Sequence, residues 1–311
     1  MKYNQLGNSS LKISEIGFGC MSLGEADKDN NAIISMAIDR GINFFDTADL
    51  YHKGRNEITI GHAIKGKRDK IILATKVGNQ LKEDGSGWNW NPTKKYILSA
   101  VEKSLERLQT DHIDLYQLHG GTIEDPIDET IEAFELLKEQ GKIRYYGISS
   151  IRPNVIAEYV KRSSIVSVMM QYSLLDRRPE EECLELLKQN NIGVLSRGAL
   201  AQGLLAGKPA KPYLDLSGEE VKQAASAVQS LSLQNNSMDD KKNGQTGRSA
   251  AQTAVRYVLQ HPSIASAVIG IRTPEQLQEM VLTTESSIFS MGEMKLLQHS
   301  GKRNVYKEHR M

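Results

Sequence analysis

Four residues with complementary acid–base chemistry occur at or just past the ends of strand-like segments in the first 119 positions of the chain. They are Asp46, Tyr51, Lys76 and His119, and the apolar runs before them cover residues 43–45, 71–74 and 115–118. Parallel barrels carry their chemistry at the carboxyl ends of the strands. We therefore expect the carboxylate, the phenol, the amine and the imidazole to meet at one end of a barrel.

These four side chains are suited to act together as one proton donor. An isolated tyrosine has a pKa of about 10, which is too high for efficient proton donation near neutral pH. A lysine cation beside a phenol favours the phenolate and so lowers the phenol's pKa, and an aspartate can hold the lysine in place. The imidazole can orient a carbonyl oxygen beside the phenol. The residue types therefore predict an acid at Tyr51 that is tuned by Lys76 and Asp46.

Eight strand-like segments alternate with helical patterns along the chain. The predicted strands cover residues 16–21, 43–47, 71–77, 115–119, 145–150, 167–172, 193–197 and 266–271. Helical patterns cover residues 32–38, 96–108, 127–140, 179–190, 219–231 and 249–261, and Pro274 suits the first turn of another helix. Eight β–α units predict one (β/α)8 barrel domain over residues 1–311 rather than a doubly wound sheet. No Gly-x-Gly-x-x-Gly motif follows a strand, which argues against a Rossmann domain.

Three segments fall outside this alternation. Residues 6–13 are expected to form a hairpin before the first barrel strand. Residues 208–247 form a long loop after the seventh strand, with a polar run at its end, and both a lid over the site and simple disorder are open. The polar, basic tail from residue 301 to 311 is expected to fray, with a lid as the alternative.

The bulk composition is that of a globular protein without nucleic-acid or membrane affinity. Apolar residues make up 39% and charged residues 25% of the chain, and the formal net charge is +1. No apolar run reaches the roughly 20 residues of a membrane span, and the first residues lack the apolar stretch of a secretory signal. Cys20 and Cys183 are too few for a disulfide scaffold or a zinc site, so we expect reduced thiols in a cytoplasmic protein.

Three motifs resemble the signatures of one known family, the aldo-keto reductases. Residues 41–51 (Gly-Ile-Asn-Phe-Phe-Asp-Thr-Ala-Asp-Leu-Tyr), with Gly54, Glu57 and Gly61 after them, resemble the first signature. Residues 74–78 (Ala-Thr-Lys-Val-Gly) and 114–119 (Asp-Leu-Tyr-Gln-Leu-His) resemble the next two. The resemblance covers nearly the whole chain and implies a barrel fold. It also implies that Tyr51 is the general acid and that His119 positions the substrate carbonyl.

A fourth motif resembles the family's adenine-nucleotide segment and covers residues 268–279. A helix that begins near Thr273 offers free N–H groups and a positive dipole end, and Arg272 offers a planar cation suited to a phosphate. The resemblance therefore implies NADPH rather than NADH. The expected cofactor residues here are Gly270, Arg272, Gln276 and Glu279. A surface pairing of Arg272 with a nearby glutamate is the alternative, and Ile271 and Met280 depart from the family pattern.

Two further segments are assigned to the cofactor by the same resemblance. The loop at residues 198–205 looks like the family's pyrophosphate loop, with Gly198, Leu200, Gln202 and Leu204 as contacts. Arg197 stands where an aromatic residue often stacks on the nicotinamide, and a guanidinium can also lie flat on a ring or reach a phosphate. A structural salt bridge is the alternative for Arg197. Ser149, Ser150 and Gln171 are expected at the nicotinamide carboxamide, although the two serines could equally cap strand ends.

The predicted reaction is hydride transfer from NADPH to a small aldehyde or ketone, without a metal. Trp88, in a loop after the third strand, and His52, where a glycine is common in the family, are the expected substrate-pocket residues. Two alternatives stay open: a cofactor-binding regulatory subunit with slow or no turnover, and a lyase that forms a Schiff base at Lys76. The sequence does not specify the substrate or the oligomeric state and is compatible with a monomer.

Overall fold

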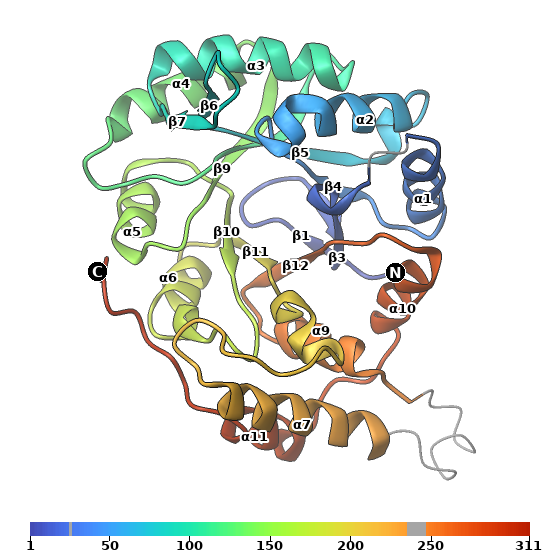
Figure 1. Cartoon of the computed structure of the whole chain (residues 1–311). Coiled ribbons are helices and arrows are strands. Elements are labelled where there is room, and N and C mark those ends of the chain that lie inside the picture. The colour runs from blue at the N-terminus through green and yellow to red at the C-terminus, as the bar shows by residue number, and fades with distance from the viewer. Residues whose placement is uncertain (25–26, 235–246) are drawn as a thin grey trace.

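The computed structural model describes residues 1–24, 27–234 and 247–311. In this part of the chain, eight parallel strands form a closed barrel with helices around it (Figure 1). The barrel strands are β3 (Ile16–Gly19), β4 (Phe44–Asp46), β5 (Ile72–Val77), β8 (Ile113–Leu118), β9 (Ile143–Ser149), β10 (Ser167–Gln171), β11 (Gly193–Arg197) and β12 (Ile264–Ile269). Each pairs with the next, and β12 pairs with β3 to close the ring. The predicted barrel is confirmed, and every predicted strand overlaps an observed one.

Apolar side chains pack in two layers around these strands. The larger cluster includes Phe45, Tyr116 and Phe134 and lies between the strands and the helices. The smaller cluster includes Phe44 and Leu115 and fills the barrel interior. Successive residues of a strand point to opposite faces, so the neighbours Phe44 and Phe45 belong to different clusters. Burial on both faces explains why β8 is buried at every one of its 6 positions.

The predicted N-terminal hairpin is present. It pairs β1 (Tyr3–Gln5) with β2 (Lys12–Ser14) in antiparallel fashion. Three of its apolar side chains are buried with the barrel interior: Leu6, Leu11 and Ile13. Gly7 has a φ of +51°, and a Cβ there would lie 2.3 Å from the carbonyl oxygen of Val166, so this close approach needs glycine. The hairpin thereby closes the amino-terminal end of the barrel, away from the predicted site.

The helices of the described residues form the outer layer (Figure 1). They are α1 (Asp27–Asp39), α2 (Arg55–Ala63), α3 (Lys94–Leu108), α4 (Ile127–Glu139), α5 (Pro153–Arg162), α6 (Cys183–Gln189), α7 (Gly218–Gln234), α9 (Ala250–Leu259), α10 (Pro274–Thr283) and α11 (Met291–His299). Side-chain caps mark several starts: Thr93 caps α3, Ser249 forms a capping box on α9, and Thr273 caps α10. The expectation that Pro274 opens a helix is confirmed. None of these helices is both long enough and apolar enough to cross a membrane.

A second hairpin follows β5 and was expected only as a loop. It pairs β6 (Asn79–Leu81) with β7 (Trp88–Trp90). Trp90 is partly buried, packs against the core and donates from its indole nitrogen to Asp125 at 2.9 Å. Trp88 is 50% exposed. Trp90 therefore anchors the hairpin to the core, whereas Trp88 is exposed enough to contact a ligand.

The C-terminal tail does not fray, which corrects the sequence-based expectation. Asn304 is 2% and Tyr306 is 8% exposed. Asn304 bridges the backbone N–H of Arg177 and the carbonyl of Leu175, so the tail is fixed by hydrogen bonds as well as by packing. The tail does not line the site cavity described below. Most of the polar run after α7 (residues 235–246) lies outside the described residues.

Candidate active site

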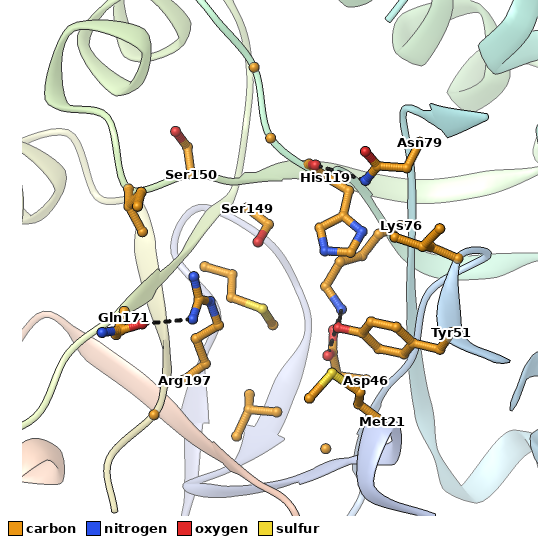
Figure 2. A pocket seen from close by; sticks show the side chains of 18 of the residues that line it. Met21, Asp46, Tyr51, Lys76, Asn79, His119, Ser149, Ser150, Gln171 and Arg197 are labelled. Carbon is orange, nitrogen blue, oxygen red and sulfur yellow. Dashed lines mark hydrogen bonds and ion pairs between the residues drawn. The ribbon is translucent and has the colours of Figure 1, made fainter. Parts of the chain in front are cut away.

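The structure brings the four predicted acid–base residues together at the carboxyl end of the barrel (Figure 2). Asp46 is the last residue of β4, Lys76 lies near the end of β5, and His119 directly follows β8. Tyr51 begins a short 3-10 helix after β4. The four residues lie together because the neighbouring parallel strands that carry or precede them end at the same edge of the barrel.

Lys76 is the centre of the group and is fully buried. Its ammonium donates to a carboxylate oxygen of Asp46 at 2.7 Å and to the carbonyl of Thr47 at 2.7 Å. It also reaches the hydroxyl oxygen of Tyr51 at 3.4 Å. Three oxygen partners match the three protons of the ammonium. This arrangement disfavours a Schiff base at Lys76, which would need a free neutral amine.

Burial and the attraction between Asp46 and Lys76 act in opposite directions on the pKa of each side chain. Burial raises the pKa of the Asp46 carboxyl, and the attraction of Lys76 and its hydrogen bond act against that rise. Burial by itself lowers the pKa of Lys76, but Asp46 and then Tyr51 outweigh it, so the pKa of Lys76 is raised. Gln117 donates a further hydrogen bond to Asp46 at 3.2 Å. The lysine is therefore a permanent cation beside the phenol.

His119 lies edge-on to the ring of Tyr51, with 5.9 Å between ring centroids. Burial, followed by the positive charges of Lys76 and Arg197, lowers the pKa of His119 to about 3. The imidazole is therefore neutral at ordinary pH and has one N–H to donate. Its buried Nδ1 has no hydrogen-bond partner in the described residues. That nitrogen is closed off from the cavity, so any contact of the His119 ring with a ligand must be made by the other nitrogen, Nε2.

These residues line a cavity of about 970 Å³, large enough for a cofactor and a substrate side by side. Eight other predicted site residues line it as well: Ser149, Ser150, Gln171, Arg197, Gly198, Gln202, Gly270 and Trp88. Leu200 is half-buried and Leu204 is buried, and both side chains pack into the core. Neither residue lines the cavity.

A smaller cavity adjoins the first and shares Met21 and Ser22 with it. It contains Arg272, at the N-terminal side of α10, and His52, which was predicted for the substrate pocket. The structure thus places His52 with Arg272 rather than with Trp88. His52 has a φ of +49°, a left-handed conformation that glycine adopts without strain, which accounts for the glycine common at this position.

The remaining predicted cofactor residues, Gln276 and Glu279, do not line these two cavities. The amide oxygen of Gln276 accepts from the backbone N–H of Arg272 at 2.9 Å, and the carboxylate of Glu279 accepts from the hydroxyl of Ser249 at 2.5 Å. The two departures from the family pattern have structural roles, because Ile271 is 0% and Met280 is 2% exposed. Neither side chain is available to an adenine.

The cavity residues that were not predicted from the sequence include Met21, Asn79, Arg152 and Tyr213. Met21 and Asn79 closely follow strand ends, and that position was a usable signal. Arg152 precedes α5, a helix that was not predicted. Tyr213 lies in the long segment after β11, and only its tertiary position brings it to the barrel mouth.

The chain belongs to the aldo/keto reductase family, whose model matches residues 15–299. It is 51% identical over 310 residues to the uncharacterized oxidoreductase YqkF of Bacillus subtilis (strain 168), with 100% of each chain covered. Among solved structures it is similar to the aldo-keto reductase AKR11C1 from Bacillus halodurans. The holo form matches with a TM-score of 0.91 at 48% identity, and the apo form with 0.82 at 46%, both over 100% of each chain. The protein is thus an oxidoreductase of this family, with a backbone more similar to the holo form.

Proposed function

We propose that the protein is an NADPH-dependent reductase of small aldehydes or ketones. The observation that carries the proposal is the fully buried Lys76, which bonds Asp46 and reaches the Tyr51 hydroxyl at the edge of the large cavity. A permanent cation beside a phenol favours the charge that the phenol acquires when it gives up its proton. This is the arrangement needed to protonate a carbonyl oxygen.

Each member of the group then has a separate task. The Tyr51 hydroxyl gives its proton to the carbonyl oxygen, and the Lys76 ammonium stabilises the phenolate that remains. The neutral imidazole of His119 donates a hydrogen bond to the same carbonyl oxygen and so orients it. Asp46 keeps Lys76 in position and balances its charge inside the protein. When NADPH is bound, its nicotinamide supplies the hydride to the carbonyl carbon.

The cavities fit a dinucleotide in shape and in charge. Ser149 and Ser150 at the end of β9 suit the carboxamide, and the backbone of the 198–204 loop suits the pyrophosphate. Arg197 donates to a neutral amide oxygen, that of Gln171, so its charge is not neutralised by that contact and is available to the cofactor. Arg272 in the adjoining cavity suits the 2′-phosphate that distinguishes NADPH from NADH. Trp88 forms a wall of the substrate region.

The test is a fluorescence titration with NADPH and, in parallel, NADH, followed by carbonyl reduction assays of Tyr51→Phe. We expect micromolar binding of NADPH and much weaker binding of NADH. The Tyr51→Phe variant should bind NADPH as the original chain does but reduce carbonyls about 100-fold to 10,000-fold more slowly. Absence of binding by either nucleotide would overturn the reductase proposal. Unchanged turnover in Tyr51→Phe would overturn the assignment of the acid.

A further inference from the structure

Arg197 is connected to residues outside the cavity by a chain of polar side chains. Its guanidinium donates to the amide oxygen of Gln171 at 3.0 Å (Figure 2). The amide nitrogen of Gln171 donates in turn to a carboxylate oxygen of Asp176 at 2.9 Å and to the hydroxyl of Tyr213 at 3.1 Å. Gln171 ends β10 and Arg197 ends β11, and the two residues are directly opposite in the strand register.

The chemistry of the neighbours fixes which way the Gln171 amide faces. An ionised carboxylate can only accept hydrogen bonds, so it requires the NH2 end of the amide. A guanidinium can only donate, so it requires the oxygen end. Asp176 on one side and Arg197 on the other therefore exclude the flipped amide. In the flipped orientation, two donors would face each other at Arg197 and two acceptors would face each other at Asp176.

Asp176 is itself held rigidly. It is 0% exposed, and Arg178 binds both of its carboxylate oxygens, each at 2.7 Å. This bidentate pairing keeps Asp176 in one orientation, as is usual for arginine and carboxylate. The ring of Tyr306, from the C-terminal tail, lies 5.4 Å from the Arg178 guanidinium and covers it. The chain of contacts thus runs from the ordered tail to the cavity.

We propose that Asp176 and Gln171 are positioning residues, which hold the Arg197 guanidinium in its cofactor-binding orientation before the cofactor arrives. The inference rests on the proposed function, in which Arg197 contacts the dinucleotide. Both N–H donors of Gln171 are already in use, so Gln171 acts through Arg197 rather than by donating to the nicotinamide carboxamide. Preorganisation matters here because a free arginine side chain loses conformational freedom when it is fixed on binding, and this loss weakens the affinity.

The experiment is a double-mutant cycle on NADPH affinity. Gln171→Met keeps the length of the side chain and removes all three of its hydrogen bonds, to Arg197, Asp176 and Tyr213, while the Asp176–Arg178 pair stays intact. We expect it to weaken NADPH binding by about three- to tenfold, because Arg197 must then be ordered on binding. In the Arg197→Met background, Gln171→Met should cause no further loss, since the residue it positions is absent. Asp176→Asn should behave like Gln171→Met in both backgrounds, with a smaller effect.

Gln260→Met is the matched control. The amide of Gln260 is also bonded at both ends, to the backbone of Phe289, and it lies away from the cavity. We expect this variant to bind NADPH with unchanged affinity. Losses that add up in the Arg197→Met background would overturn the inference, because they would show that Gln171 contacts the cofactor directly or acts through general stability.

A crystal structure of ligand-free Gln171→Met separates this inference from the proposed function. We expect the Arg197 side chain to leave its position beside β10 or to become disordered, with the rest of the barrel unchanged. An Arg197 side chain that keeps its place in the variant would overturn the inference, whatever the cofactor. Failure of the proposed function would show differently, as absence of NADPH binding by the unaltered chain.

Discussion

Lys76 and Asp46 illustrate how much a single buried residue depends on its partners. A lone charge inside a protein is costly to bury, and the cost is offset only when partners satisfy every hydrogen bond. Lys76 meets this condition with three oxygens, one of which belongs to Tyr51. In the proposed mechanism, the contact that stabilises the lysine is therefore the same contact that prepares the phenol for proton donation.

The low pKa of His119 leads to a prediction about stability and pH. The unfolded chain binds a proton at His119 as the pH falls through about 6.5, whereas the folded chain does not until about pH 3. The unfolded state therefore binds more protons in this window, so acidification destabilises the fold. We expect His119 to account for a loss of roughly 1–2 kcal/mol in the free energy of unfolding between pH 7 and pH 5. Urea unfolding at the two pH values measures it.

The variant His119→Asn should lose less stability than the unaltered chain over the same pH range. His62→Asn is the control, because His62 is exposed on α2 and its surroundings change little on unfolding. Equal pH dependence in His119→Asn and in the unaltered chain would show that His119 is not buried in its neutral form. Activity should show no transition from His119 between pH 4 and pH 8, since the ring stays neutral throughout.

At the scale of elements, the packing of the β6–β7 hairpin depends on Gly78, which lies against the ring of Trp90. A Cβ on Gly78 would lie 2.6 Å from the Trp90 ring, and Gly78 also has a φ of +122°. We expect Gly78→Ala to lower the free energy of unfolding by roughly 1–3 kcal/mol through the clash and the strained backbone. It should also shift the tryptophan emission, because Trp90 must move. Denaturation followed by fluorescence measures both effects.

Gly292→Ala provides the comparison for this substitution. Gly292 lies in α11, and a Cβ there would meet only the Ser290 hydroxyl oxygen, at 3.9 Å. Alanine in a helix is favoured over glycine by about 1 kcal/mol, so this variant should be as stable as the original or more so. A Gly78→Ala variant with unchanged stability and emission would show that Trp90 does not pack on Gly78.

Elements with a clear local pattern of apolar residues could be predicted from the sequence, and elements without such a pattern could not. The strands were recognisable because both of their faces are largely buried and most of their residues are apolar. Helix α2 was missed because Asn56 and Gly61 weaken its pattern, yet Gly61 is needed there. A Cβ on Gly61 would lie 2.7 Å from the backbone of Arg107 and of Leu108, so α2 packs against α3 only with glycine. Tertiary packing overrides helix propensity in such a place.

The site shows the same division between local and long-range information. The positions of Asp46, Lys76 and His119 follow from strand ends, which are visible in the sequence. The bonds that engage Gln171 do not, because Asp176 and Tyr213 reach it only through a turn and a long loop. The sequence by itself therefore indicates which residues border the cavity, but not which of these residues are already hydrogen-bonded to others.

At the scale of the whole molecule, the tail contributes to the stability of the barrel. Tyr306 is 8% exposed and covers Arg178, whereas its neighbour Val305 is 43% exposed. We expect Tyr306→Ala to lower the free energy of unfolding by roughly 2–4 kcal/mol, because a buried aromatic ring is lost. Val305→Ala should change it by less than about 0.5 kcal/mol. Similar effects of the two substitutions in thermal unfolding would contradict an anchored tail.

The pairing of β3 with β12 has a consequence for folding of the chain during its synthesis on the ribosome. These strands begin at residues 16 and 264, so the ring cannot close until most of the chain has been synthesised. Until then β3 presents an unpaired edge, and the apolar residues of the N-terminal hairpin have no complete barrel interior to pack against. Open strand edges and exposed apolar surface favour aggregation. We therefore expect the nascent chain to depend on chaperones up to the emergence of β12, with later steps proceeding quickly.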